Sequence, residues 1–343
     1  MSKIRIGISL GDTNGIGPEI VVKAFEGGKF GEETVPIVYG ELPLLERLSK
    51  GRNHAILLLK ITAPEDARAG FLNVIECWPE PVEYEPGIPT LASGMAAAVS
   101  LEYAVEDLRT GRIDALVTAP INKANMPRDR FPYPGHTEML TDRLGADQSL
   151  MLLVNEGLRV GLVSNHLPVA QVAGAVTRET ILRKLAIMHA SLRQDFGCAE
   201  PRIAVFGLNP HAGDNGLLGH EEQTIIEPTL KEAQRRGINA TGPYPADGFF
   251  GTGAQRNFDA ILAMYHDQGL VPFKALSFGN GVNFTAGIPA IRTSPDHGTA
   301  FDIAGQDKAD AASFVQAVRV AVEAVKRRGA VSSYGLVSEG RTL

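Results

Sequence analysis

Residues 92–118, ASGMAAAVSLEYAVEDLRTGRIDALVT, join a long segment of helical period to a short apolar run. Residues 92–110 have the spacing of a helix, and residues 113–118 are short and apolar enough to form a buried strand. The same alternation of long helical segments with short runs rich in Val, Ile and Leu recurs along the chain. This pattern predicts an α/β fold with a largely parallel sheet and helices on its faces.

One segment departs from that alternation. Leu150–Val154 and Leu158–Val163 are apolar and are separated only by Asn155-Glu156-Gly157, which is typical of a hairpin. We therefore expect a mixed sheet. The clearest predicted helices are 92–110, 178–195, 221–236 and 310–328, and the predicted strands are 4–10, 35–39, 54–62, 71–76, 113–118, 150–154, 159–164, 202–207, 259–265 and 281–286.

The length of 343 residues indicates about two domains at ~150 residues each. Because no flexible linker is visible, the chain must cross any boundary in short connections. The Pro-rich segment 126–134 and the Gly-rich segment 278–287 are the best candidates. We expect a discontinuous first domain of residues 1–125 plus 285–343, which would bind the cofactor, and a second domain of residues 126–284.

Charge and composition exclude several classes of protein. There are 33 Lys and Arg against 39 Asp and Glu, a net charge of −6 that is spread along the chain, so we expect no nucleic-acid or membrane surface. The chain has no run of 18 apolar residues and no signal-peptide pattern. Cys77 and Cys198 are far apart and form no C-x-x-C motif, which is typical of free thiols in a reducing compartment. We expect a cytoplasmic enzyme.

Three predicted strands each lead directly into a histidine. These histidines are His166 in VGLVSNH (160–166), His211 in IAVFGLNPH (203–211) and His266 in ILAMYH (261–266). The ligand crevice of an open α/β sheet lies at the carboxyl ends of its strands, so the three side chains can meet there. Each histidine alone is better explained as a hydrogen-bonded loop residue, but three imidazoles together are typical of a catalytic divalent-metal site.

Two carboxylates lie near these histidines in the sequence. Asp247 follows Tyr244-Pro-Ala on what reads as a Pro- and Gly-framed loop, and Asp267 directly follows His266. A metal ion acidifies a bound hydroxyl, and a nearby carboxylate can accept the proton. Asp247 is the better candidate for this base, although an aspartate on a loop is also explained by a role in turning the backbone. Asp267 is as well explained as a residue that orients a metal ligand.

Several polar groups suit an anionic ligand. Lys274, Asn283 and Arg292 lie near Gly-rich stretches, and GHTE (135–138) begins a predicted helix whose free N–H groups can bind an anion. The first turn, GDTNGIGPE (11–19), is not G-x-G-x-x-G, so the Rossmann fingerprint is absent. A second polar, Gly-bearing loop spans residues 294–305.

Six motifs in the same order closely resemble the 4-hydroxythreonine-4-phosphate dehydrogenase family of pyridoxal phosphate biosynthesis. The resemblance covers essentially the whole chain. The motifs are GHTE (135–138), SNHLP (164–168), GLNPHAG (207–213), PAD (245–247), MYHDQG (264–269) with Lys274, and RTSPDHGTA (292–300).

The resemblance implies a role for each matching residue. It implies that His166, His211 and His266 bind a divalent metal (Zn, Mg, Mn or Co), and that the substrate contacts are His136, Thr137, Lys274, Asn283 and Arg292. It also implies a homodimer with metal ligands shared between subunits, and two three-layer α/β/α domains with a cleft between them, similar to isocitrate and isopropylmalate dehydrogenases. HGTAFDIAG (297–305) is similar to the loop that holds the adenosine end of NAD in those enzymes, which assigns the cofactor, NAD or NADP, to His297, Gly298, Thr299 and Asp302.

The implied activity is oxidation of 4-phosphohydroxy-L-threonine at C3, followed by loss of carbon dioxide to give 3-amino-2-oxopropyl phosphate. Two positions depart from the family pattern: Thr13-Asn14 stands where Pro-Ala or Pro-Ser is usual, and Gly248 where Thr is common. They leave open a dehydrogenase of D-threonate or D-erythronate 4-phosphate. Less favoured alternatives are a phosphate acyltransferase, a metal-dependent hydrolase or aldolase, and a non-catalytic binding module.

Overall fold

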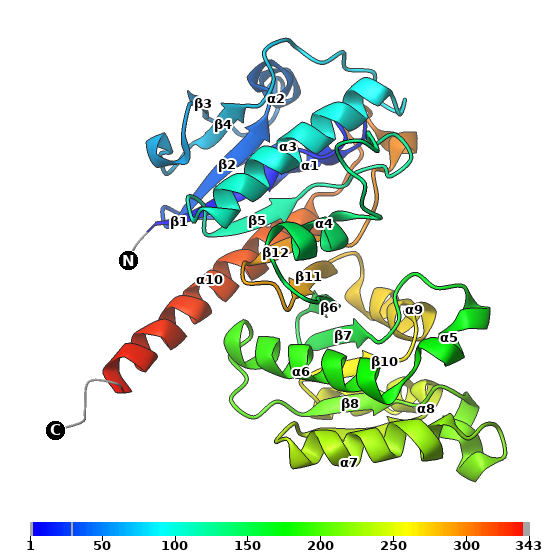
Figure 1. Cartoon of the computed structure of the whole chain (residues 1–343). Helices are drawn as coiled ribbons and strands as arrows, with labels where there is room; N and C mark the ends of the chain where they lie inside the picture. The colour runs from blue at the N-terminus through cyan, green and yellow to red at the C-terminus, as the bar shows by residue number, and fades with distance from the viewer. Residues whose placement is uncertain (1–2, 29, 339–343) are drawn as a thin grey trace. The chain divides into compact units, whose positions relative to one another are not determined.

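The computed structural model describes residues 3–28 and 30–338, which form two compact units (Figure 1). Unit 1 consists of Met1–Asp147 and Ile288–Lys326, and unit 2 of Gln148–Gly287 and Arg327–Leu343. Residues 126–147, which we expect from sequence in the second domain, belong to unit 1. The physical reason is that Met126, Phe131 and Met139 are buried in the same apolar cluster as Leu101 of unit 1.

The strands of unit 1 that the structure describes form a parallel arrangement in the order β3-β4-β2-β1-β5-β12. All residues of the central strand β2 are buried, as expected for a parallel strand covered on both faces. The bounds are β1 (Ile4–Ser9), β2 (Thr34–Gly40), β3 (Leu58–Ile61), β4 (Leu72–Glu76), β5 (Ala115–Thr118) and β12 (Arg292–Pro295).

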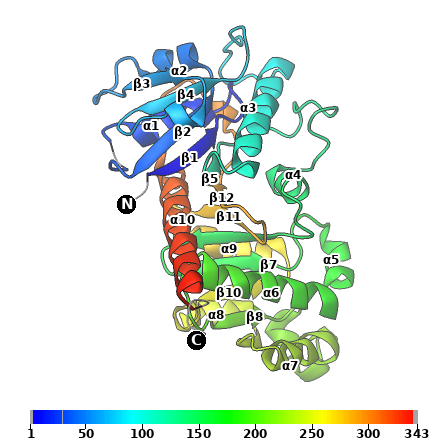
Figure 2. The same cartoon turned by 60° about the vertical axis from the view of Figure 1, so that its left-hand side comes forward.

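The helices of unit 1 cover this sheet, with α1 and α3 on opposite sides of it (Figures 1 and 2). The helix α3 begins with a capping box, in which Thr90 and Ser93 satisfy each other's backbone N–H groups. Its residues Leu101 and Ala104 pack with Ile37 and Tyr39 of β2. The helices are α1 (Gly17–Phe25), α2 (Leu42–Ser49), α3 (Leu91–Arg109) and α4 (His136–Arg143), with short helical turns η1 (Pro64–Asp66) and η5 (Phe301–Ile303). The long helix α10 (Ala312–Ser338) belongs to unit 1 up to Lys326 and to unit 2 from Arg327.

The described strands of unit 2 have the order β11-β6-β7-β10-β8-β9. The strands β6 and β7 form the predicted antiparallel hairpin, β11 runs antiparallel to β6, and β7, β10, β8 and β9 are mutually parallel. The mixed, mostly parallel α/β class is confirmed. The bounds are β6 (Leu150–Asn155), β7 (Leu158–Leu162), β8 (Ile203–Phe206), β9 (Ala240–Tyr244), β10 (Ala260–Ala263) and β11 (Val282–Ala286).

Two helices of unit 2 cover opposite faces of its strands. Phe273 of α9 packs with Leu153, whereas Met188 of α6 approaches Leu150 and Gly161, whose side-chain positions face the other way in their strands. The helices are α5 (Val169–Ala175), α6 (Arg178–Gln194), α7 (Glu227–Arg235), α8 (Ala246–Gly251) and α9 (His266–Ser277), with helical turns η2 (Pro210–Gly216), η3 (Glu222–Ile226) and η4 (Ala254–Asn257).

The sequence pattern misses two strands and overextends a third. The strands β9 (ATGPY) and β12 (RTSP) contain proline and polar residues, so neither shows the apolar run on which strand prediction depends. The predicted strand 54–62 is strand only at Leu58–Ile61. Within the described residues, no helix combines the length and the apolar character that crossing a membrane requires.

Candidate functional site: strand-end histidines, an anion site and a polar loop

The three histidines follow three neighbouring strands, because β10 pairs in parallel with both β7 and β8. His166 follows β7, His266 follows β10 and His211 follows β8. Asp247 follows β9, the next parallel strand in the order. The carboxyl ends of these four strands lie at one edge of the sheet, so the topology expected from sequence is present in unit 2.

His166 and His266 lie close together, with ring centroids 5.8 Å apart. The Nδ1 atom of His266 lies 2.7 Å from Oδ1 of Asp267, so this carboxylate holds the ring and leaves Nε2 for another ligand. Among the described residues of a single chain, no three His, Cys, Asp or Glu side chains are grouped to hold a metal ion. The structure thus brings together two of the three predicted metal ligands, His166 and His266, and a carboxylate orients the second of them.

His211 lies on a turn with unusual backbone geometry. Residues 211–215 all have positive φ, with 53° at His211 and 43° at Asp214, which is costly for residues other than glycine. Glu222 is only 2% exposed and holds the start of this turn. Its carboxylate accepts the backbone N–H groups of Leu208 and Asn209 at 2.7 and 2.8 Å and the Asn209 amide at 3.0 Å.

Glycines make room for this carboxylate. A Cβ atom on Gly213 would lie 2.6 Å from Oε2 of Glu222, and one on Gly207 would lie 3.1 Å from Oε1. Gln268 then links the ends of two strands: its Nε2 donates to the carbonyl of Gly207 at 2.7 Å, and its Oε1 accepts the N–H of Met264 at 2.8 Å. The segments that carry His211 and His266 are therefore fixed to each other by hydrogen bonds.

The remaining predicted residues of unit 2 lie on regular elements. Asp247 lies in the first turn of α8 and not on a loop as expected; it is exposed, with no hydrogen bond to another described residue. Lys274 lies in the last turn of α9 and is also exposed. Asn283 lies in β11, and its buried Oδ1 has no hydrogen-bond partner among the described residues.

In unit 1, the His136 ring lies near the cations Arg292 and Lys123 at the start of α4. Burial, followed by the charges of Arg292 and Lys123, holds the pKa of His136 well below its usual range, so its ring is neutral at neutral pH. Its buried Nε2 has no hydrogen-bond partner among the described residues. Such an atom next to two cations and a helix N-terminus is suited to an anion that carries a donor.

Arg292 is almost completely buried, and its Nη2 donates to Oγ1 of Thr118 at 2.6 Å. Burial lowers the pKa of this guanidinium to about 10, and the Glu138 carboxylate opposes the shift. Arg292 is thus still charged at neutral pH. A buried guanidinium costs much desolvation free energy, which a bound carboxylate or phosphate would offset. Thr137 follows His136 in the first turn of α4.

The predicted cofactor loop packs on the first turn of the chain. The carbonyl of Thr299 accepts the N–H of Ile16 at 2.9 Å. A Cβ atom on Gly15 would lie 2.9 Å from that carbonyl oxygen, so only glycine permits the close approach. The buried Nε2 of His297 has no partner among the described residues, whereas Asp302 and Gly298 are exposed. An unpartnered imidazole nitrogen beside exposed polar groups fits the adenosine end of a dinucleotide.

Asn14, one of the residues that depart from the family pattern, holds a neighbouring segment. Its side-chain amide donates to the carbonyl of Ile88 and accepts the N–H of Glu85, and its own carbonyl accepts the N–H of Gly87. The side chain of Asn14 therefore fixes residues 85–88 through two hydrogen bonds.

Sequence reasoning missed Lys123, Asn14, Glu222 and Gln268 as functional or supporting residues. Gln268 stands inside the MYHDQG motif, so its position carried a signal. Glu222 follows another acidic residue at the start of a predicted helix, and such a pair is usually explained as part of a solvent-exposed helix face. Only the fold shows that it is buried beneath the turn of His211.

Comparison with known proteins agrees with this architecture. The model of the family described as pyridoxal phosphate biosynthetic protein PdxA matches residues 32–321. The chain is 48% identical, over 95% of its length and 90% of the relative's, to a 4-hydroxythreonine-4-phosphate dehydrogenase of Bacteroides thetaiotaomicron. It is 39% identical to the enzyme of that name from Sulfurihydrogenibium, over 93% of this chain and 98% of the relative's. A crystal structure of 4-hydroxythreonine-4-phosphate dehydrogenase from Klebsiella pneumoniae superposes with a TM-score of 0.82 at 35% identity, covering 94% of this chain and all of that one. The chain belongs to the PdxA family of pyridoxal phosphate biosynthetic proteins.

Proposed function

We propose that the protein is a nicotinamide-dependent dehydrogenase that oxidises 4-phosphohydroxy-L-threonine at C3. The product, 2-amino-3-oxo-4-phosphooxybutanoate, loses carbon dioxide to give 3-amino-2-oxopropyl phosphate. The observation that carries this proposal is the 48% identity over 95% of the chain to a relative named for this activity. The geometry of the described residues supports it.

The anionic ends of the substrate require cations and donors. Arg292 and the start of α4, with His136 and Thr137, suit one anionic group, because Arg292 is a buried cation whose N–H donors match the oxygens of an anion. Lys274 and Asn283 add a cation and an amide whose buried Oδ1 has no partner among the described residues. We assign these five residues to substrate binding, where they would hold the reacting carbon in position.

The donor set of unit 2 fits a divalent metal. His166 and His266 would hold it from one chain, and His211 from the partner subunit would complete the set. A metal held there would lower the pKa of the C3 hydroxyl, and a bound nicotinamide would supply the hydride acceptor. We assign NAD, with NADP as an alternative, to His297, Gly298, Thr299 and Asp302, because the buried Nε2 of His297 has no partner among the described residues.

The two carboxylates would have different roles. Asp247 is exposed and bonded to no other described residue, so its oxygens are available to accept the proton of the C3 hydroxyl. Asp267 is engaged with Nδ1 of His266 at 2.7 Å, so it would orient that ring. Asp247 is therefore the proposed general base.

A homodimer would supply the third histidine. Unit 2 exposes large apolar side chains on two helices and the adjoining residues, including Val169 of α5 at 83%, Val271 of α9 at 63% and Phe278 at 84%. Exposed apolar groups of this size favour contact with another protein surface. The thiols of Cys77 and Cys198 are free, which agrees with a reducing, cytoplasmic location.

The test is formation of NADH from three hydroxy acid phosphates, with and without a chelator. We expect turnover of 4-phosphohydroxy-L-threonine that far exceeds turnover of D-threonate and D-erythronate 4-phosphates, and loss of turnover with chelator. A preference for either D-sugar acid phosphate would replace the proposed substrate. Absence of NADH with all three would refute a dehydrogenase of this class, and release of acyl groups from an acyl phosphate would indicate the acyltransferase instead.

A further inference from the structure

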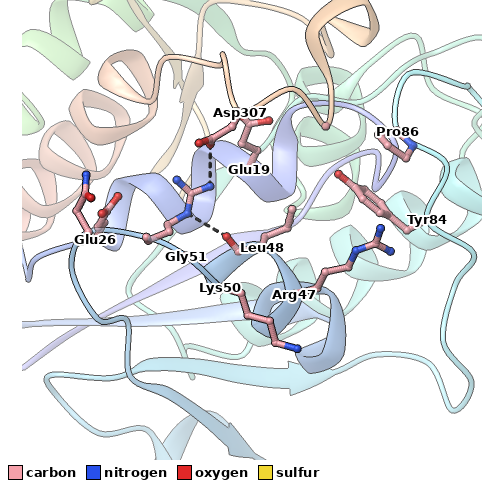
Figure 3. A pocket seen from close by; sticks show the side chains of 12 residues that line it. Glu19, Glu26, Arg47, Leu48, Lys50, Gly51, Tyr84, Pro86 and Asp307 are labelled. Carbon is pink, nitrogen blue, oxygen red and sulfur yellow. Dashed lines mark hydrogen bonds and ion pairs between the residues drawn. The ribbon is translucent and has the colours of Figure 1, made fainter.

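The cavity shown in Figure 3 lies in unit 1 and has a volume of about 390 Å³. Gly305 and Asp307 in its lining continue the loop assigned above to the cofactor, so the cavity belongs to that proposed site. Its side chains hold one another in place. Arg52 donates to Asp307 at 3.0 Å, and the guanidinium carbon of Arg47 lies 5.0 Å from the centre of the Tyr84 ring. A feature outside the proposed ligand contacts lies at the strand ends of unit 2.

A row of hydrogen bonds joins the carboxyl ends of four neighbouring strands in unit 2. At the ends of β7 and β10, the backbone N–H and the hydroxyl of Ser164 donate to the carbonyl of Met264 at 3.2 and 2.9 Å. At the ends of β8 and β9, the N–H of Gly207 donates to the carbonyl of Tyr244 at 2.9 Å. The two halves of the row are joined by the side chain of Gln268, which lies at the start of α9.

The link through Gln268 differs from the others because a side chain stands between the two strands. Direct backbone pairing of β10 with β8 reaches Leu262 opposite Val205. Two residues further along each strand, the Gln268 amide bonds to both backbones: its Oε1 accepts the N–H of Met264 at 2.8 Å, and its Nε2 donates to the carbonyl of Gly207 at 2.7 Å. An amide carries an acceptor and donors, so it satisfies both backbone groups while it holds them apart by its own length. Gln268 is thus a spacer between the ends of β10 and β8.

The spacer separates strand ends that carry histidines. The ends of β7 and β10 are bonded directly, and the rings of His166 and His266 that follow them have centroids 5.8 Å apart. The ends of β10 and β8 are bonded through the amide, and within the described part of the chain His211 does not join the other two in a three-residue metal cluster. The separation of His211 from the pair therefore agrees with the presence of the spacer.

The position of Gly207 is passed on to the turn that carries His211. A Cβ atom on Gly207 would lie 2.8 Å from Cα of Ala212, the residue after His211, so the backbone of the strand end packs directly against this turn. Because closely packed segments cannot shift independently, a change in the distance between Met264 and Gly207 would move His211 relative to His266.

We propose that Gln268 is a positioning residue that sets the separation between His266 and the turn of His211, and thereby the affinity of the protein for a divalent metal. The inference rests on the metal-dependent function proposed above for the roles of the two histidines. In a homodimer that shares its ligands, the same amide joins the histidine that serves one metal site to the histidine that serves the other.

The test is equilibrium binding of Co²⁺ to the metal-free protein, measured by calorimetry and by the visible absorption spectrum, which reports the coordination geometry of the ion. Replacing a residue that positions metal ligands lowers metal affinity about 10–100-fold, and we expect a loss in this range for Gln268→Met, which lacks both hydrogen bonds. Gln268→Glu keeps the acceptor for Met264 but turns an oxygen toward the carbonyl of Gly207, so it should lose affinity as well. Gln268→Asn should not restore the affinity, because its amide is one methylene too short to reach both backbone groups.

Gln194→Met is the matched control, because Gln194 is exposed at the end of α6 and its side chain bonds to no other described residue. Its Co²⁺ affinity and spectrum should equal those of the wild type. Thermal unfolding of each variant distinguishes positioning from stabilisation, since a residue that only stabilises the fold would lower the melting temperature and leave the Co²⁺ affinity of the folded protein unchanged. Gln268→Glu has nearly the same size as the native residue and carries the test if Gln268→Met does not fold.

Co²⁺ affinities of Gln268→Met and Gln268→Glu within about twofold of that of Gln194→Met would overturn the inference and leave the metal site intact. Absence of Co²⁺ binding by the wild-type protein would refute the metal site itself, and the inference with it. NADH formation that persists in the metal-free protein would contradict the proposed function, whereas a loss of Co²⁺ affinity confined to the Gln268 variants would still support the positioning role.

Discussion

Replacing Glu222 with alanine should destabilise unit 2 through the turn that carries His211. The carboxylate is 2% exposed and accepts three hydrogen bonds, two of them from the backbone N–H groups of Leu208 and Asn209. A buried donor left without a partner costs about 1–3 kcal/mol. Two such donors, less the desolvation cost that the missing carboxylate no longer imposes, give an expected loss of about 2–4 kcal/mol in the free energy of unfolding.

Glutamine is the informative second substitution. Glu222→Gln keeps one oxygen for the two backbone donors but turns an amide N–H₂ toward the Asn209 amide, so we expect a loss of about 1–2 kcal/mol. Urea unfolding followed by circular dichroism measures both values, and hydrogen exchange at Leu208 and Asn209 shows whether the effect is local. Glu200→Gln is the control, because Glu200 is an exposed carboxylate that bonds to no other described residue. A Glu222→Ala protein within about 0.5 kcal/mol of that control would show that the hydrogen bonds do not stabilise the turn.

Three further predictions concern the site itself. Burial and neighbouring cations lower the pKa of His136 in the folded protein. Below pH 6.5, the usual pKa of a histidine, this side chain therefore binds a proton in the unfolded chain but not in the folded one. Stability should therefore fall as pH decreases below 6.5, by up to about 1.4 kcal/mol per pH unit, and His136→Gln should show a shallower decline in urea titrations across that range. Arg292→Lys should raise the KM for the substrate at least about tenfold while the KM for NAD stays constant, since a lysine lacks the paired donors; equal changes in both would indicate misfolding. Mixing His211→Ala and His266→Ala subunits should restore about one quarter of wild-type activity if the metal site is shared between chains, because half of the dimers are mixed and each has one intact site; no restoration would mean that each chain supplies all three ligands.

The sequence established the class of fold and much of the local architecture. The apolar runs of the buried strands and the Asn-Glu-Gly turn of the β6–β7 hairpin are short-range signals, and both are present as expected. The histidines at three strand ends also follow from local pattern, since a strand and the loop after it are contiguous. The motifs they belong to identify the family for the same reason.

The tertiary structure decided which of those strand ends are neighbours and which side chains are buried. Strand order depends on pairing between residues about 100 positions apart, such as Leu162 with Ala263, and no local pattern encodes it. The burial of Glu222 and Arg292 and the stacking of Arg47 on Tyr84 are likewise set by packing between distant segments. Polar residues in short strands, such as Arg292 in β12, are predicted as loop because hydrophobic periodicity detects only the burial of apolar residues. A charge can be buried in a strand only where the fold brings partners from distant segments to offset its desolvation cost.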